Sequence, residues 1–181
     1  YENIMVEIGG EVRTLSDKKL WRIGVSTPSI GNFNYDIEYI VPITNHSLAT
    51  SGNYRNFYVD DNKNFYHHEI NPLSGYPIQS NLGSISILTT TSCMEADGLS
   101  TALYMMDTKE VKIFLDRSNF EGLMIIQNED GSFEKIFSNN FPKLTKVPLT
   151  SISKGIFSIM ISSPLSGRRI VFLSIAILDG E

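Results

Sequence analysis

Apolar and polar side chains alternate in short segments through most of this chain, and a spacing of two is typical of half-buried β-strands. In the first segment Ile4, Val6 and Ile8 alternate with polar neighbours, Gly9-Gly10 interrupts them, and Val12 resumes the alternation. We expect a strand with a glycine bend, where a ligand or another backbone can approach closely. Further strands are predicted at residues 20–28, 35–43 and 82–91, with a hairpin at residues 57–70 that turns at Asp60-Asp61-Asn62.

Helical spacing of apolar residues begins only after these strands. Ser92 followed by Glu95 has the form of a capping box, which predicts a helix that begins near Ser92. Asp107 followed by Glu110 repeats this form and predicts a second helix through about Leu115.

The residues after the helices again have the pattern of strands. Residues 121–137 show the alternation of a hairpin, with a turn at residues 128–131. Strands therefore outnumber helices, and the helices come late in the sequence. This order predicts an α+β fold, with a few helices packed against a mainly antiparallel sheet.

Charge and composition exclude several classes of protein. A net charge of −5 argues against binding nucleic acid through general attraction to phosphate. The single cysteine, Cys93, allows neither an internal disulfide nor a zinc cluster, and its setting favours a buried small apolar position over a reactive thiol. The most apolar segment, residues 156–178, is interrupted by Pro164 and by Gly167-Arg168-Arg169. No run of the roughly 20 apolar residues that cross a membrane remains, so we expect two short buried strands there, or a non-native tail.

Two early stretches concentrate glycine and hydroxyl residues. IGGEVR, residues 8–13, is either a glycine-hinged strand or a place where a planar or phosphorylated ligand approaches, with Glu11 or Arg13 as polar contacts. SLATSGNYRNF, residues 47–57, crowds small residues and hydroxyls around Gly52. It can form an anion pocket of backbone N–H groups and hydroxyls, or a loop that ends in a strand, and the pattern leaves both open.

Two adjacent histidines open the stretch HHEINPLSGYP, residues 67–77. Alternation along a strand places His67 and His68 on opposite faces, so they cannot both point at one site. We expect one to be structural or solvent-facing, and only the other to serve acid–base chemistry or phosphate binding. The pattern alone favours a structural role for either one.

A carboxylate and a hydroxyl share one face of the first predicted helix. In MEADGLSTA, residues 94–102, Asp97 and Thr101 are spaced i and i+4. Such a pair of hard oxygens suits Mg²⁺ or Ca²⁺ rather than zinc, with waters, a carbonyl or a substrate phosphate completing the coordination shell. The alternative, which this stretch favours when taken singly, is an ordinary first turn of a helix, where the dipole stabilises aspartate.

Together and in this order, the four stretches resemble the FAD:protein FMN transferases of the ApbE family. The C-terminal half of that family runs through an IGGE strand, S-ATSG-Y, HHI-DP-TGYP and an AD-LATAL helix, and the match here extends over residues 1–141. The family's aspartate is Asn71 here, which keeps a hydrogen-bonding role without a charge, and its Arg-Thr is Leu73-Ser74, which keeps the hydroxyl. The family's N-terminal half contains a flavin-binding segment similar to SIAKGY. It has no counterpart before these stretches, and the similar string LTSISKG occupies residues 149–155.

The resemblance implies a division of the chain. Residues 1–143 correspond to the C-terminal portion of an ApbE-like flavin transferase, and residues 144–181 form an extension without a counterpart. The opening YENIMVEIGGEV, with strand-like alternation and no initial Met, is typical of a fragment or a trimmed chain. We therefore expect a piece of a longer protein, which the family places outside the cytoplasm on a lipid anchor.

The resemblance also assigns roles to residues. His68 matches the histidine that the family keeps, so it is the candidate catalytic residue beside the FAD pyrophosphate, and Asp97 and Thr101 match the family's Mg²⁺ ligands. The residues implied in binding FAD are Glu11, Thr50, Ser51, Gly52, His68, Asn71, Ser74 and Gly75. The implied reaction is the Mg²⁺-dependent transfer of FMN from FAD to a Thr or Ser hydroxyl of an acceptor flavoprotein, with release of AMP. The alternatives are hydrolysis of FAD to FMN and AMP, a non-catalytic FAD-binding protein, and an inactive fragment.

Overall fold

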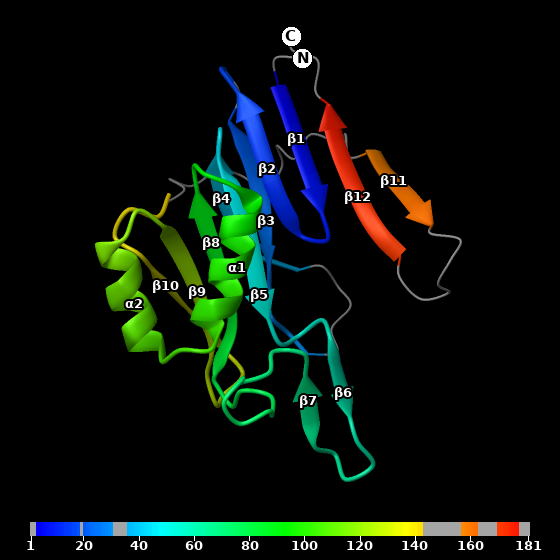
Figure 1. Cartoon of the computed structure of the whole chain (residues 1–181), viewed down its shortest axis with the longest axis vertical. Helices are drawn as coiled ribbons and strands as arrows, with labels where there is room; N and C mark the ends of the chain where they lie inside the picture. Colours follow the sequence, from blue (N-terminus) through cyan, green and yellow to red (C-terminus); the bar gives the residue numbers. More distant parts are fainter. Residues whose placement is uncertain (1–2, 19, 31–35, 143–156, 163–169, 178–181) are drawn as a thin grey trace.

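An antiparallel sheet organises the molecule. The computed structural model describes residues 3–18, 20–30, 36–142, 157–162 and 170–177. Its main sheet has eight strands in the spatial order β10-β9-β8-β5-β2-β1-β12-β11 (Figure 1), and every neighbouring pair is antiparallel. The strands of this sheet are β1 (Asn3–Ile8), β2 (Glu11–Ser16), β5 (Ser47–Gly52), β8 (Leu82–Thr89), β9 (Glu121–Gln127), β10 (Phe133–Phe137), β11 (Phe157–Ser162) and β12 (Ile170–Ile177).

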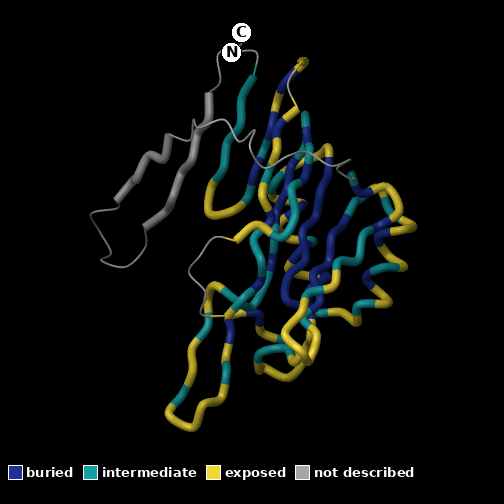
Figure 2. Tube along the Cα trace, turned by 180° about the vertical axis from the view of Figure 1, so that it is seen from behind, coloured by how far each residue is buried: buried dark blue, intermediate teal, exposed yellow. Residues whose placement is uncertain are grey.

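Two layers cover the opposite faces of this sheet. The helices α1 (Cys93–Tyr104) and α2 (Thr108–Arg117) lie on one face, and a separate hairpin of β3 (Trp21–Ser26) and β4 (Ile37–Ile43) packs on the other (Figure 1). Because both faces are covered, β8 is buried along its whole length (Figure 2). The predicted α+β fold, with helices on a mainly antiparallel sheet, is confirmed.

Strand alternation divides the interior into two cores. In β5 Ala49 belongs to the core under the helices, while its neighbour Leu48 belongs to the core under the β3–β4 hairpin. The helix-side core contains Ala49, Leu82, Ile85, Ile87, Ala96, Leu103, Tyr104, Val111, Leu115, Met124 and Ile126. The hairpin-side core contains Val12, Trp21, Val25, Val41, Ile43, Leu48, Leu88, Leu123, Ile125 and Phe141.

Both helices begin where the capping residues predict. The Ser92 hydroxyl accepts a hydrogen bond from the backbone N–H of Glu95 at the start of α1. The Asp107 carboxylate accepts one from the N–H of Lys109 at the start of α2. Cys93 is half-buried rather than buried, and its thiol lies 3.1 Å from the carbonyl oxygen of Val12. Burial raises the pKa of this thiol, which argues against a reactive thiolate.

The predicted glycine bend near the start of the chain is wrong. Gly9 and Gly10 form the turn of a hairpin whose strands, β1 and β2, pair Ile8 with Glu11. Both glycines have positive φ, 68° and 113°, a conformation that costs glycine little. The Glu7 carboxylate accepts the N–H of Gly10 and closes the turn. Glu11 is therefore the first residue of a new strand.

A second hairpin, β6 (Phe57–Val59) and β7 (Phe65–His67), projects from the main sheet (Figure 1). Its turn forms as predicted, because the Asp60 carboxylate accepts the backbone N–H groups of Asn62 and Asn64. Tyr58 and Tyr66 stack across this hairpin and are both exposed. The hairpin leads directly into the segment that contains His68.

The C-terminal segment adds two strands to the main sheet. Within residues 156–178, where two strands were predicted, β12 pairs with β1 and β11 pairs with β12. The string LTSISKG, residues 149–155, lies outside the described residues. The division of the chain at residues 143 and 144 stays a prediction. Within the described part of the chain, neither helix has the length and apolar character needed to span a membrane.

Candidate functional site

Helix α1 carries the predicted metal ligands on its exposed face. Asp97 and Thr101 lie one turn apart, and both are exposed, so their oxygens point to the same side of the helix. The buried side of α1 packs on the sheet through residues such as Ala96 and Leu103. The shared face predicted from the spacing is therefore present, while metal binding itself stays a prediction.

A chain of hydroxyl groups orients Thr101. The Ser100 hydroxyl donates to the carbonyl oxygen of Asp97 at 2.9 Å, so toward Ser51, 2.9 Å away, it acts as the acceptor. Ser51 therefore donates to Ser100 and accepts from the Thr101 hydroxyl, 3.0 Å away. Since the single proton of Thr101 is committed to Ser51, the remaining lone pairs of its oxygen are left for another partner. That is the state in which a hydroxyl binds a cation.

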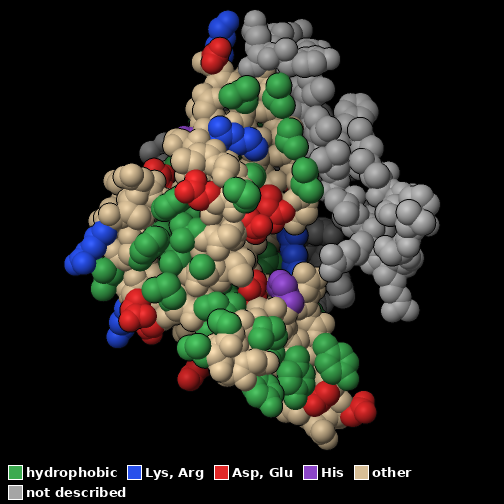
Figure 3. Space-filling model, viewed as in Figure 1, with side chains coloured by type: hydrophobic (Ala, Val, Ile, Leu, Met, Phe, Trp, Pro, Cys, Tyr) green, Lys and Arg blue, Asp and Glu red, His purple; other side chains and the backbone are tan. Residues whose placement is uncertain are grey.

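The surroundings of Asp97 are acidic. Glu11, at the start of β2, is half-buried, and burial raises its pKa; the negative charges of Asp97 and Glu7 raise it further, while Arg55 and its own backbone hydrogen bond lower it. Figure 3 shows acidic side chains and a histidine on this face of the molecule, above the β6–β7 hairpin. A divalent cation beside Asp97 would relieve this repulsion.

The oxygens at this site fit a hydrated hard cation. A carboxylate and an acceptor-oriented hydroxyl are ligands that Mg²⁺ prefers, and Mg²⁺ usually keeps several waters and takes substrate phosphate oxygens. Among the described residues, no group of three or more His, Cys, Asp or Glu side chains could enclose a metal ion. Asp97 and Thr101 supply two oxygens, and waters or substrate phosphate oxygens would complete the coordination shell of a metal bound there.

The two adjacent histidines face opposite ways, as predicted. His67 is buried, its Nε2 donates to the carbonyl oxygen of Ile78 at 3.0 Å, and its ring meets the ring of Tyr104 edge-on. The Nδ1 of His67 accepts the N–H of Glu69, so the ring is neutral, and burial also lowers its pKa; His67 is a structural residue. His68 is the solvent-facing member, with 47% of its side chain exposed, and it alone of the pair can meet a substrate.

One carbonyl oxygen fixes the orientation of His68. The ring Nδ1 and the backbone N–H of His68 both lie 3.2 Å from the carbonyl oxygen of Asn56. A carbonyl oxygen only accepts, so Nδ1 carries the hydrogen. In the neutral ring Nε2 is then the nitrogen with a free lone pair, the form that a general base needs.

Sequence reasoning missed one charged residue in this region. Glu69 follows His68 and is buried, 5% exposed, with its Oε1 3.6 Å from Nε2 of His68. Burial raises the pKa of Glu69; the charge of His68 lowers it, and the charge of Asp97 raises it. One feature of the sequence could have pointed to Glu69: the family pattern, HHI-DP-TGYP, has an isoleucine at this position.

The loop after Glu69 is held by its own side chains. The Asn71 side chain accepts the N–H of Leu73 at 2.9 Å, and the Ser74 hydroxyl accepts the N–H of Tyr76. The N–H of Gly75 donates to the carbonyl oxygen of Asn71. Asn71, Ser74 and Gly75 thus shape the loop beside His68, as expected, while direct contact with FAD stays a prediction.

The structure separates the three predicted pocket residues of β5. Ser51 faces α1, whereas Thr50 faces the other side of the sheet, where its hydroxyl lies 2.7 Å from that of Ser86. At Gly52, a Cβ atom would lie 2.8 Å from the carbonyl oxygen of Gly83. Close packing between β5 and β8 therefore accounts for this glycine, and a common pocket for all three residues stays a prediction.

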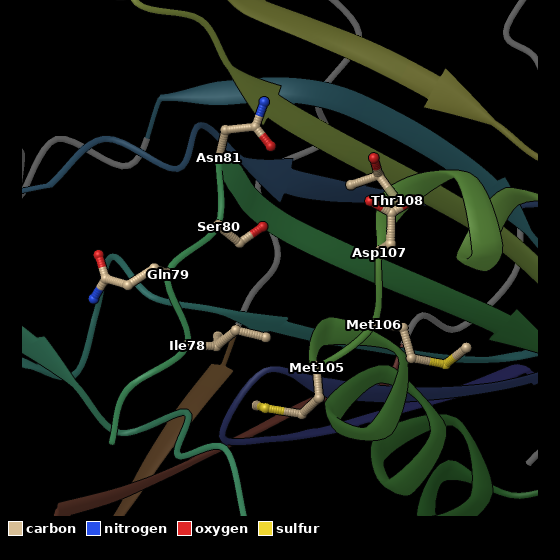
Figure 4. Close-up of a pocket in the computed structure, with 8 residues that line it drawn as sticks. All are labelled: Ile78, Gln79, Ser80, Asn81, Met105, Met106, Asp107 and Thr108. Atoms are coloured by element: carbon tan, nitrogen blue, oxygen red, sulfur yellow. The ribbon is translucent and has the colours of Figure 1, made fainter. Parts of the chain in front are cut away.

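A separate cavity lies at the far end of α1 (Figure 4). It has a volume of about 330 Å³ and lies between the loop that precedes β8 and the junction of the two helices. Its lining residues are Ile78, Gln79, Ser80, Asn81, Met105, Met106, Asp107 and Thr108. None of the residues predicted for the site lines it, so the candidate site is the open surface around Asp97, Thr101 and His68.

Comparison with known proteins identifies relatives of the chain. Residues 1–124 match the profile of the ApbE family. The FAD:protein FMN transferase of Haemophilus influenzae is 37% identical over 148 residues, which cover 80% of this chain and 42% of that protein. The enzyme of the same name from Vibrio cholerae is 36% identical over 148 residues, which cover 80% of this chain and 43% of that protein.

Solved structures show the same relationship. The flavin transferase ApbE from Vibrio cholerae superposes with a TM-score of 0.61 at 36% identity, covering 77% of this chain and 43% of that one. The ApbE protein of Thermotoga maritima superposes with a TM-score of 0.63 at 30% identity, and the match covers 76% of this chain and 43% of that one. The chain spans less than half the length of the relatives that it matches.

Proposed function

The chain belongs to the ApbE family, and on this premise we propose that it supplies the metal-binding and histidine-bearing part of an FAD:protein FMN transferase. The complete protein would transfer FMN from FAD to a Thr or Ser hydroxyl of an acceptor protein and release AMP. Relatives named FAD:protein FMN transferase support flavin transfer from FAD. Placement outside the cytoplasm, on a lipid anchor, is part of the same proposal and follows from the family alone.

Asp97 and Thr101 would hold Mg²⁺ beside the FAD pyrophosphate. When bound, Mg²⁺ supplies neutralisation of the negative charge on the pyrophosphate oxygens. The contribution of the chain is to present the two oxygens in advance: helix α1 fixes Asp97, and the bond to Ser51 fixes the Thr101 hydroxyl with its lone pairs outward. This oriented pair is the observation that carries the proposal.

His68 would remove the proton from the attacking hydroxyl. The oxygen of the acceptor hydroxyl attacks the phosphorus on the FMN side of FAD, the bond from that phosphorus to the bridging oxygen breaks, and AMP leaves with that oxygen. The proton of the hydroxyl goes to Nε2 of His68, the nitrogen left free by the bond between Nδ1 and Asn56. The product is FMN joined to the acceptor through a phosphoester.

Transfer can be measured directly. The complete protein is incubated with FAD, Mg²⁺ and an acceptor protein, and the mass gain of FMN on the acceptor is followed. Asp97→Asn and His68→Gln are each expected to slow this gain by about 100-fold. Glu134→Gln, at an exposed position on β10, serves as the control and retains it. A mass gain that persists in either site variant would refute the role given to that residue.

Hydrolysis is the second candidate, because His68 is half exposed to water. Water can then replace the acceptor hydroxyl and yield FMN and AMP. Release of AMP at the same rate with and without the acceptor would identify a pyrophosphatase. FAD binding without AMP release in either case would identify a non-catalytic binder.

A further inference from the structure

Glu69 is a buried carboxylate beside the solvent-facing histidine. It is 5% exposed, and its backbone is fixed on both sides: its N–H donates to Nδ1 of His67 at 3.3 Å, and its carbonyl oxygen accepts the N–H of Ile78 at 3.1 Å. The position of its carboxylate is thus set by strand β7 and the loop that returns to β8. The carboxylate lies on the side of His68 that carries Nε2.

The distance between the two groups distinguishes charge pairing from hydrogen bonding. Oε1 of Glu69 is 3.6 Å from Nε2 of His68, which is too long for a hydrogen bond but close enough for strong charge attraction. The lone pair of Nε2 therefore stays available for a proton from elsewhere. Once that proton arrives, the ring becomes a cation with a buried anion beside it.

We infer that Glu69 is a positioning residue for His68, one whose carboxylate stabilises the imidazolium formed when Nε2 takes the proton of the attacking hydroxyl. This inference rests on the proposed function. Other groups also act on the carboxylate: Asp97 of α1 repels it, and the buried phenol of Tyr104 lies within its electrostatic reach. The half-exposed His68 supplies a compensating positive charge once Nε2 has taken the proton.

A double-mutant cycle separates this role from a structural one. In the complete protein, Glu69→Gln is expected to lower kcat for FMN transfer by about 10-fold, since water screens a pair with one half-exposed partner. The KM for FAD is expected to change by less than about 2-fold, because only the charge of the transition state is affected. In a His68→Gln background the same substitution is expected to have no further effect, since the cation that it stabilises is absent.

Two further variants complete the kinetic test. Glu121→Gln is the matched control, because Glu121 is a half-buried glutamate that interacts with a histidine, His46, and neither residue is assigned to the site. It should leave kcat unchanged. Glu69→Asp keeps the charge and should recover part of the rate, which also covers the case in which Glu69→Gln does not fold.

A titration tests the pairing without turnover. Carbon-13 NMR of the Glu69 carboxylate gives its pKa in the wild-type protein and in His68→Gln, a change at an exposed position. Because the charge of His68 lowers the pKa of Glu69, this pKa should rise in His68→Gln. An unchanged pKa would overturn the inference, as would an equal loss of kcat in both backgrounds of the cycle or an unchanged kcat in Glu69→Gln. Absence of FMN transfer by the wild-type protein would instead overturn the proposed function, and this inference with it.

Discussion

The side-chain oxygens of Ser51 and Thr101 lie 3.0 Å apart, in a hydrogen bond that joins strand β5 to the exposed face of helix α1. Ser51 is itself 7% exposed, so its hydroxyl is positioned for the helix rather than for solvent. A residue that sequence similarity assigns to FAD binding thereby gains a second proposed role, the orientation of Thr101, which we propose as a metal ligand.

Ser51→Ala should weaken Mg²⁺ binding. Loss of the acceptor for its proton frees the Thr101 hydroxyl to rotate, and we expect the Kd for Mg²⁺ to rise by about 10-fold. The free energy of unfolding should fall by about 1 kcal/mol. Calorimetric titration of the complete protein with Mg²⁺ in the presence of FAD, without an acceptor protein, measures the Kd, and urea denaturation measures the stability.

The control for this prediction is Ser86→Ala. Ser86 is buried, and its hydroxyl pairs with Thr50 on the other face of the sheet. Ser86→Ala should lower the free energy of unfolding about as much as Ser51→Ala does, but it should leave the Kd for Mg²⁺ unchanged. Equal Mg²⁺ affinity in Ser51→Ala and the wild-type protein would show that the hydroxyl chain does not prepare Thr101.

Local signals in the sequence predicted the local features of the fold. The caps at Ser92 and Asp107 and the Asp60 turn involve residues two to four apart, so their hydrogen bonds are visible as spacing. The opposite orientation of His67 and His68 follows from strand alternation for the same reason.

Features that depend on distant partners could not be predicted in this way. The residues around Gly9-Gly10 alternate in the same way whether the two glycines bend a single strand or join two strands. Only the pairing of β1 with β2 shows that they join two strands. The burial of Glu69 depends on the segment that returns through Ile78. Strand alternation does predict that Thr50 and Ser51 face opposite sides of the sheet. The family resemblance instead assigned all residues of this motif to one pocket.

Two carboxylates outside the site should give opposite pH dependences of stability. Burial raises the pKa of Glu121 above 4.5, so its stabilising contribution is present below that pH and is lost as the pH rises through the folded-state pKa. Hydrogen bonds from Asn64 lower the pKa of Asp60 below 3.8, so its contribution is present above that pH and is lost as the pH falls.

Urea denaturation at several pH values tests this contrast. Relative to the wild-type protein, Glu121→Gln should become more stable as the pH rises from 4 to 7, in the window that starts near 4.5. Asp60→Asn should be less stable at pH 7, with a deficit that shrinks as the pH falls through and below about 3.8. If the stability of both variants relative to the wild-type protein changed in the same direction with pH, the burial of Glu121 and the hydrogen bonds of Asp60 could not be the causes of the two pKa shifts.

A pair of glycine substitutions tests whether packing accounts for Gly52. A Cβ atom at Gly52 would lie 2.7 Å from the Tyr54 ring and 2.8 Å from the carbonyl oxygen of Gly83. Gly52→Ala should therefore lower the free energy of unfolding by about 1–3 kcal/mol. At Gly98, on helix α1, nothing lies within 4 Å of the added atom, so Gly98→Ala should raise it by about 0.5–1 kcal/mol. Thermal and urea denaturation measure both, and a neutral Gly52→Ala would leave ligand contact as the reason for this glycine.

The adjacent histidines should separate stability from catalysis. His67→Ala removes a buried ring and its bond to Ile78, so the free energy of unfolding should fall by about 1–3 kcal/mol. FMN transfer per folded molecule should fall by no more than the roughly 10-fold expected for Glu69, whose N–H loses its acceptor on His67. His68→Ala removes a half-exposed ring, so stability should change by less than about 0.5 kcal/mol while transfer is lost. Urea denaturation and the mass gain of the acceptor, each normalised to folded protein, give the two readouts. The reverse result, a stable His67→Ala that transfers no FMN, would move the catalytic role to the buried histidine and contradict the orientation on which the mechanism depends.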